Sequence, residues 1–212
     1  MVFDPGKIIL RGRDVTLRPL ERTDAPELAI TAAESREQYR FTIVPSDPAE
    51  AYQYIERAIE QRNEGQRYPF AVVFLGRVVG STSYLDLRPW DWPAGSAMAR
   101  PNRPDACEIG ATWLANSAQQ TRCNTEAKFL LLSHAFEKWD VHRVSLQTDA
   151  RNERSRRAIE RLGAKFDGIL RAHKAASDGA VRDSAFYSIL AAEWPAVRER
   201  LSGFLARDAT VR

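Results

Sequence analysis

The sequence predicts a mixed α/β domain, on the basis of its length, its composition and the order of its strand and helix patterns. The 212 residues correspond to about one domain. Hydrophobic residues make up 44% of the chain and charged residues 28%, as in folded globular proteins. Strand and helix patterns alternate through to the C-terminal end, and no repeat with a period of roughly 20 to 50 residues appears. We therefore expect one domain over residues 1–212.

Seven segments have the apolar alternation or the β-rich composition of strands. They are residues 15–20, 68–75, 78–87, 107–114, 141–148, 166–174 and 181–190. Two turn signals, Gly76-Arg77 and Asp178-Gly179, each lie between two of these segments and are typical of hairpins. Antiparallel pairing is therefore expected for the strands on either side of each turn.

Helices are predicted where a capping residue or a proline precedes apolar residues spaced three and four apart. Thr23-Asp24-Ala25-Pro26 begins the first helix, and Asp47-Pro48 begins a second that ends near Gly65. A strongly helical and buried segment begins near Thr125. A short helix over residues 155–162 ends at Gly163, and a C-terminal helix is expected over residues 191–208.

Residues 88–105 have neither a strand period nor a helix period and contain four prolines. Long loops in compact domains are often lids or binding loops. A surface loop packed by its own Trp90 and Trp92 explains the pattern equally well. Both interpretations stay open at this point.

Composition excludes several classes of protein. No apolar run reaches the roughly 18 residues of a membrane span, and Met1 to Leu10 lacks the apolar core of a signal peptide, so we expect a cytoplasmic protein without a membrane partner. Cys107 and Cys123 have no zinc-binding spacing, so no metal site is predicted. The net charge of +3 comes from basic residues spread among acidic ones, which argues against nucleic acid binding.

The segment from Glu108 to Lys128 predicts a strand, a polar turn and the start of a buried helix. Free backbone N–H groups at a helix N-terminus can bind a phosphate, and the side chain of Arg122 could add a charge-assisted contact. On spacing alone, Asn124 or Thr125 could instead simply cap the helix.

Several motifs together resemble the GNAT superfamily of acyl-CoA-dependent N-acetyltransferases, and within it the Rim-type branch that includes ribosomal-protein-alanine N-acetyltransferases. The motifs are Val15-Thr16-Leu17-Arg18-Pro19-Leu20, Glu108-Ile109-Gly110, Asn124-Thr125-Glu126-Ala127, Ala150-Arg151-Asn152-Glu153-Arg154-Ser155, Leu162-Gly163-Ala164 and Glu193-Trp194-Pro195. The resemblance covers nearly the whole chain. It implies a single, mixed, mostly antiparallel and twisted sheet of about seven strands with helices on both faces.

The resemblance also implies acetyl-CoA as the cofactor. Its pyrophosphate would bind the turn before the long helix, in a gap where the preceding strand splays away from its parallel neighbour. The residues implied in cofactor binding are Trp113, Leu114, Gln119, Gln120, Thr121, Arg122, Cys123, Asn124, Thr125, Asn152 and Ser155. The family usually has glycine where this chain has Arg122, and glycine or alanine where it has Asn124, so both side chains must point outward for the backbone to reach a pyrophosphate.

Amine acetylation requires a base for the amine and an acid for the leaving thiol. We expect Glu108 to be the base, although a surface carboxylate would explain it equally well, and Ser155 to be the acid, unless it only caps the following helix. Tyr39, Tyr84 and Trp90 could line the acceptor pocket, and core packing is the alternative.

The predicted function is transfer of an acetyl group from acetyl-CoA to a primary amine, such as a protein or peptide N-terminus. A non-catalytic CoA-binding or regulatory module is the alternative, and a homodimer is possible.

Overall fold

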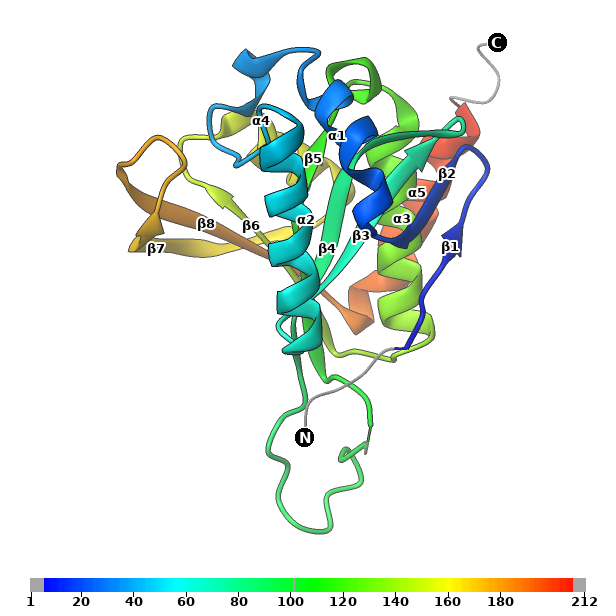
Figure 1. Cartoon of the computed structure of the whole chain (residues 1–212). Coiled ribbons are helices and arrows are strands. Elements are labelled where there is room, and N and C mark those ends of the chain that lie inside the picture. Colours follow the sequence, from blue (N-terminus) through cyan, green and yellow to red (C-terminus); the bar gives the residue numbers. More distant parts are fainter. Residues whose placement is uncertain (1–5, 101, 208–212) are drawn as a thin grey trace.

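The structure is a computed structural model that describes residues 6–100 and 102–207, and its centre is one eight-stranded sheet (Figure 1). The strands lie in the order β1-β2-β3-β4-β5-β6-β8-β7. Their bounds are β1 (Leu10–Arg11), β2 (Val15–Pro19), β3 (Arg67–Phe74), β4 (Arg77–Arg88), β5 (Ala106–Leu114), β6 (Arg143–Asp149), β7 (Lys165–Ala175) and β8 (Val181–Leu190). All neighbours pair antiparallel except β5 and β6, which are parallel.

Helices cover both faces of the sheet, as predicted. They are α1 (Ala25–Ala32), α2 (Pro48–Asn63), α3 (Arg122–Glu137), α4 (Glu153–Leu162) and α5 (Trp194–Arg207), with short 3₁₀ turns η1 (Arg22–Asp24), η2 (Arg36–Tyr39), η3 (Asn116–Ala118) and η4 (Ala191–Glu193). α1 and α2 pack on the β2–β5 half of one face, and α3 packs with α5 on the other face, so that the sheet separates two apolar cores (Figure 1).

The predicted mixed and mostly antiparallel sheet is confirmed, with one strand more than the seven expected. The additional strand, β1, pairs only Leu10 and Arg11 with β2. Two residues are too few to produce an alternation pattern, which is why the sequence did not reveal it.

The helix boundaries follow local capping chemistry. Asp47 caps α2 by accepting a hydrogen bond from the backbone N–H of Glu50 at 2.9 Å, and Gly163 ends α4 in the left-handed conformation, as the sequence predicts. α3 begins earlier than expected, at Arg122, because Thr121 is its N-cap and accepts from the N–H of Cys123 at 3.1 Å. The predicted start near Thr125, and the predicted capping by Asn124 or Thr125, are therefore wrong.

The parallel pair β5–β6 separates soon after it begins. Only Ala106, Cys107 and Glu108 pair with β6, opposite residues 143–145. Beyond Glu108, β5 stays paired with β4 as far as Leu114, while β6 continues along β8. The sheet is therefore split from Glu108 onward, and the split widens toward the ends of the two strands from which α3 and α4 follow.

A β-bulge shapes the split edge. Ala111 has a φ of 47°, and the pairing of β5 with β4 shifts register at this point. On the α3 side, the hydroxyls of Thr82 and Thr112 lie 2.7 Å apart, and the buried Lys128 ammonium donates to the Thr112 hydroxyl at 2.6 Å. Lys128 therefore ties the bulge to α3.

The loop between β4 and β5 is packed by its own aromatic residues. Trp90 and Trp92 lie 5.6 Å apart, ring centroid to ring centroid, and both contact the ring of His142. Asp105 accepts from the Trp90 backbone N–H at 2.7 Å and from the Trp92 indole at 3.1 Å. This is one of the two interpretations that the sequence left open.

At the C-terminal end, the helix expected over residues 191–208 consists of η4 and α5, and residue 208 lies outside the described residues. Within residues 6–100 and 102–207, no helix combines the length and apolar character needed to cross a membrane.

We expect Lys128 to make the protein more stable as the pH rises from about 7 to about 9. Burial lowers the pKa of Lys128 from 10.5 to about 7, so over this range the unfolded chain holds a proton that the folded protein has released. The free energy of unfolding should rise by about 2 kcal/mol on this account. Below about pH 7, Lys128 is protonated in both the folded and the unfolded protein, so its contribution to the free energy of unfolding no longer changes with pH.

Urea unfolding of the wild type and of Lys128→Met at both pH values measures this effect, because the variant cannot titrate. The stability difference between the two proteins should change with pH by the stated amount. Parallel pH profiles for the two proteins would contradict the prediction.

Candidate active site

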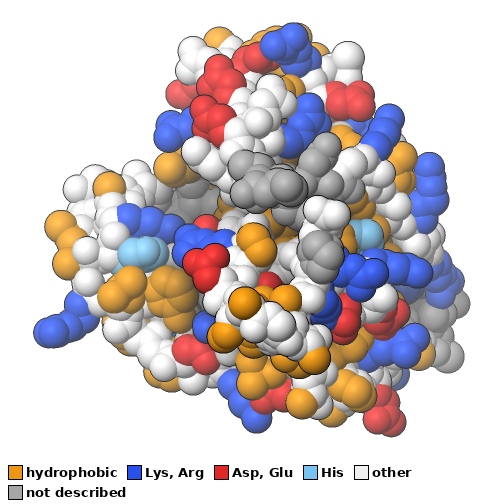
Figure 2. Space-filling model, turned by 90° about the horizontal axis from the view of Figure 1, so that it is seen from below, with side chains coloured by type: hydrophobic (Ala, Val, Ile, Leu, Met, Phe, Trp, Pro, Cys, Tyr) orange, Lys and Arg blue, Asp and Glu red, His pale blue; other side chains and the backbone are white. Residues whose placement is uncertain are grey.

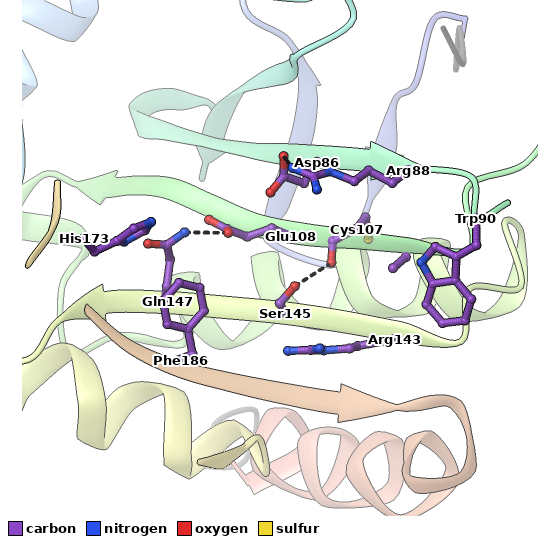
Figure 3. Close-up of a pocket in the computed structure, with 11 residues that line it drawn as sticks. Asp86, Arg88, Trp90, Cys107, Glu108, Arg143, Ser145, Gln147, His173 and Phe186 are labelled. Carbon is purple, nitrogen blue, oxygen red and sulfur yellow. Dashed lines mark hydrogen bonds and ion pairs between the residues drawn. The ribbon is translucent and has the colours of Figure 1, made fainter. Parts of the chain in front are cut away.

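A cavity of about 270 Å³ lies where β5 and β6 still pair, on the sheet face that carries α1 and α2 but beyond the half that these helices cover (Figure 3). Its lining comes from five strands, β4 to β8, and from the loop after β4. The residues are Asp86, Arg88, Trp90, Ala106, Cys107, Glu108, Arg143, Ser145, Gln147, His173 and Phe186. The cavity therefore extends from the paired part of β5 and β6 to Gln147, just beyond the last pair, where the sheet begins to split.

Glu108 is the buried acid of this cavity. Its side chain is 5% exposed and accepts a hydrogen bond at Oε2 from the Nε2 of Gln147 at 2.7 Å (Figure 3). Burial raises the pKa of Glu108, and the Gln147 hydrogen bond and the charge of Lys174 oppose this rise. The alternative of a surface carboxylate is therefore wrong, because the Glu108 side chain is buried.

Gly110 provides the space that the Glu108 carboxylate occupies. A Cβ at Gly110 would lie 2.7 Å from Glu108 Oε1 and 2.8 Å from a methyl group of Leu85. The carboxylate therefore folds along β5 over Gly110, toward the bulge at Ala111 and the split in the sheet. This is a physical reason for the Glu-Ile-Gly sequence at this place.

Gln147 is a site residue that the sequence reasoning did not select. Its Nε2 donates to Glu108, and its Oε1 is buried without a hydrogen-bond partner among the described residues. An amine carries N–H donors that this oxygen could accept. The alternation of polar Ser145 and Gln147 with apolar Val144 and Leu146 along β6 is the signal that could have identified it.

The N-terminus of α3 lies at the other end of the split. Gln120 has a φ of 57°, and the first backbone N–H groups of α3 have no partner within the helix. The N-terminus of α4 lies nearby, since Arg154 donates to the side chain of Gln119 at 2.9 Å and to the backbone carbonyl of Gln38 at 2.7 Å. Two helix N-termini therefore flank the opening, and their dipoles favour an anion there.

The side chain of Arg122 points away from this opening. Its guanidinium lies 3.2 Å from Asp14 and 3.5 Å from Glu126, and it is 8% exposed. Glu126 in turn accepts from the backbone N–H of Asp14 at 3.0 Å and from that of Arg13. The prediction that the Arg122 side chain contacts the anion is therefore wrong, and its outward direction leaves the backbone of the turn accessible.

Trp113 and Leu114 form the β5 side of the opening. Trp113 is 4% exposed and packs edge-on against Tyr39, with ring centroids 6.0 Å apart. The Leu114 carbonyl accepts from the Tyr39 hydroxyl at 3.0 Å and from the Gln119 side chain at 2.9 Å. Tyr39 thus holds the end of β5 and does not line the cavity, contrary to its predicted place in the acceptor pocket.

Of the two other predicted substrate-binding residues, Tyr84 lies in the core and Trp90 lies at the cavity. Tyr84 is fully buried on the α3 face and donates to the Leu131 carbonyl at 2.6 Å, so its prediction as a substrate-binding residue is wrong. Trp90 does line the cavity.

Asn152 is the N-cap of α4 and accepts from the N–H of Ser155 at 3.0 Å. Ser155 therefore does not cap the helix, which contradicts the capping alternative.

The two cysteines are core residues. Cys107 and Cys123 are buried and burial raises the pKa of both thiols, that of Cys123 to about 12, so neither is a ready nucleophile. Over residues 6–100 and 102–207, no three His, Cys, Asp or Glu side chains are grouped so that they could hold a metal ion.

A parallel strand pair that opens toward two helix N-termini, beside a buried carboxylate, suits an enzyme that holds a phosphate-bearing acyl carrier and deprotonates a nucleophile. Comparison with known proteins agrees with this class. Residues 14–165 match the family model described as "Acetyltransferase (GNAT) domain". The chain belongs to this GNAT acetyltransferase family.

The chain is similar to several members in sequence and structure. It is 26% identical over 185 residues to the "Putative ribosomal N-acetyltransferase YdaF" of Bacillus subtilis (strain 168), covering 85% of this chain and 93% of that protein. A GCN5-related N-acetyltransferase from Brucella melitensis superposes with a TM-score of 0.80 at 28% identity, covering 95% of this chain and 86% of that one. A "putative acetyltransferase" from T. thermophilus superposes with a TM-score of 0.76 at 34% identity, covering 93% of this chain and 96% of that one.

The resemblance predicted from the sequence motifs is confirmed, and the protein is an acetyl-CoA-dependent N-acetyltransferase. The turn at residues 120–124 fits such a cofactor. The Arg122 side chain is turned away and so does not obstruct the backbone of the turn. The split also leaves β5 backbone groups without partners on β6, and the cofactor can bind them.

We expect Gly110→Ala to lower kcat while leaving CoA affinity nearly unchanged. The new Cβ must displace the Glu108 carboxylate or the Leu85 methyl group, and a small displacement of a catalytic group costs about tenfold to a hundredfold in rate. Free thiol release gives kcat, and calorimetry gives the dissociation constant of CoA.

The matched control is Gly203→Ala on α5, where a Cβ meets nothing within 4 Å. This variant should keep the wild-type kcat. A Gly110→Ala enzyme with wild-type kcat would show that the direction of the Glu108 carboxylate is unimportant.

Proposed function

We propose that this N-acetyltransferase acetylates the α-amino group of a protein or peptide, with Glu108 as the base. One observation carries the proposal, namely the buried Glu108 carboxylate between the cavity and the split sheet. The name of the Bacillus relative, a ribosomal N-acetyltransferase, supports a protein acceptor.

The cavity offers the groups that an amine requires. Glu108 presents a carboxylate whose pKa is raised by burial, and Gln147 presents an Oε1 without a partner among residues 6–100 and 102–207. Together they can orient an amine through its N–H groups, and Glu108 then accepts the proton that the amine must lose before it attacks. Trp90 would bound the acceptor on the side of the β4–β5 loop.

Acetyl-CoA supplies the acetyl group as a thioester. The backbone N–H groups of residues 120–124 would hold its diphosphate, and the β5 backbone at Trp113 and Leu114 would lie along its pantetheine arm. In this proposal Asn152 orients the start of α4, and the Ser155 hydroxyl holds a proton at the place where a leaving thiolate needs one. We also propose that the enzyme acts in the cytoplasm and forms a homodimer. Both parts of the proposal rest on the sequence.

We expect Glu108→Gln to lower kcat/KM for a peptide amine by about a hundredfold or more, because the base is lost. In the wild type, kcat/KM should rise with pH as Glu108 loses its proton. Since its pKa is raised, the midpoint of this rise should lie above the ordinary value of 4.5. Thiol release measured across pH, with calorimetry of CoA binding, reports both effects.

The control is Glu199→Gln, an exposed carboxylate on α5 that should leave the profile unchanged. If Glu108→Gln retains the wild-type kcat/KM and the same fall of kcat/KM toward low pH, Glu108 is not the base.

A further inference from the structure

Two basic side chains lie directly opposite one another on the hairpin of β7 and β8. Lys174 and Arg182 are cross-strand partners in the register of these strands. Like charges at directly opposed positions of a sheet are destabilising. Such a pair is therefore retained at a cost unless something negative lies between or above the two charges.

No ion pair inside the described part of the protein neutralises the two charges, and the nearby carboxylates, Glu108 and Asp86 for Lys174 and Asp149 and Glu108 for Arg182, act only from beyond ion-pair distance. Among residues 6–100 and 102–207, neither Lys174 nor Arg182 has a carboxylate oxygen within 4.0 Å. The neighbouring arginines differ in this respect. Arg88 pairs with Asp86 at 3.0 Å, Arg143 with Asp167 at 2.9 Å, and Arg151 with Asp149 at 2.8 Å.

The pair borders the proposed acceptor cavity. Lys174 directly follows His173, which lines the cavity, and Arg182 shares a sheet face with Phe186, another lining residue (Figure 3). Seen from below, Lys and Arg side chains lie on the side of the molecule where β7 and β8 are found (Figure 2). Desolvation and the charge of Arg182 lower the pKa of Lys174, and Glu108 and Asp86 oppose this shift, so the pair lies within electrostatic reach of the base.

Arg182 is oriented to bind an anion. Its Nε donates to the Ser184 hydroxyl at 2.9 Å, which fixes the plane of the guanidinium. The same hydroxyl lies 2.9 Å from the Nδ1 of His173. Among the described residues, the hydrogen bond of the Arg182 side chain is made by Nε, which leaves its Nη groups to bind both oxygens of a carboxylate.

We propose that Lys174 and Arg182 form an anion subsite, so that the acceptor is an amine with a carboxylate a short distance from it, such as an acidic peptide N-terminus. The inference rests on the proposed function, with the amine end held at Glu108 and Gln147. A polyamine or another wholly cationic amine would meet the two positive charges and be rejected. An acidic peptide and a free acidic amino acid share the required chemistry.

Calorimetry in the presence of CoA tests the subsite without relying on turnover. The probes are three peptides that begin with serine and differ only at their second and third residues, which are both Asp, both Asn or both Lys, together with free aspartate. We expect the Asp peptide to bind about tenfold or more tightly than the Asn peptide, and the Lys peptide to bind weakest. Comparable binding of free aspartate would assign the subsite to an amino acid rather than a peptide.

Arg182→Gln and Lys174→Met should each remove most of the preference for the Asp peptide and leave binding of the Asn peptide nearly unchanged. The matched control is Arg77→Gln, an exposed arginine at the opposite end of β4 from Asp86, which should keep the full preference. Equal dissociation constants for the three peptides, or a preference that survives both variants, would overturn the inference.

Thiol release with the same peptides separates this inference from the proposed function. Turnover of the Asn peptide without a preference for Asp would leave the proposed function intact and overturn the subsite. Tight binding of the Asp peptide without turnover of any peptide would support the subsite and count against the proposed function.

Discussion

The short parallel contact between β5 and β6 is the constraint on which the site depends. The two strands pair over only three residues, and both then leave the contact in directions fixed by their antiparallel neighbours, β4 and β8. Backbone groups along the split need partners, and α3 and α4 begin where the split is widest. A split sheet between two helix N-termini is thus a structural cost, and its free backbone groups suit an elongated, phosphate-bearing molecule.

Buried polar contacts keep this opening in shape from both sides. Lys128 ties the bulge in β5 to α3, and the Asp14, Arg122 and Glu126 cluster ties the first turn of α3 to the turn before β2. Buried ion pairs such as those of Arg122 contribute little net stability, but they fix geometry because any displacement leaves a charge without a partner. In this chain, an arginine at the usual glycine position is tolerated because the cluster holds its side chain away from the turn.

The sequence predicted the order of the elements better than their ends or their side-chain directions. Hairpin turns and the caps Asp47 and Gly163 are local signals, and the structure confirms them. The direction of Arg122 depends on Asp14, far away in the chain, so no local pattern could reveal it. The true start of α3 was missed because Thr121 lies in a polar run where several residues could cap a helix. Tyr84 was misassigned because strand alternation does not tell which face a helix covers.

The central claim is that the main chain before α3, together with the split edge of β5, binds the cofactor. Titration of ¹⁵N-labelled protein with CoA, followed by amide NMR, tests it directly. The claim predicts that the largest shifts fall on the N–H groups of residues 120–124 and 109–113, with the surface arginines of α5 unaffected. Shifts confined to exposed basic side chains, with the amides of residues 120–124 unchanged at saturation, would contradict it.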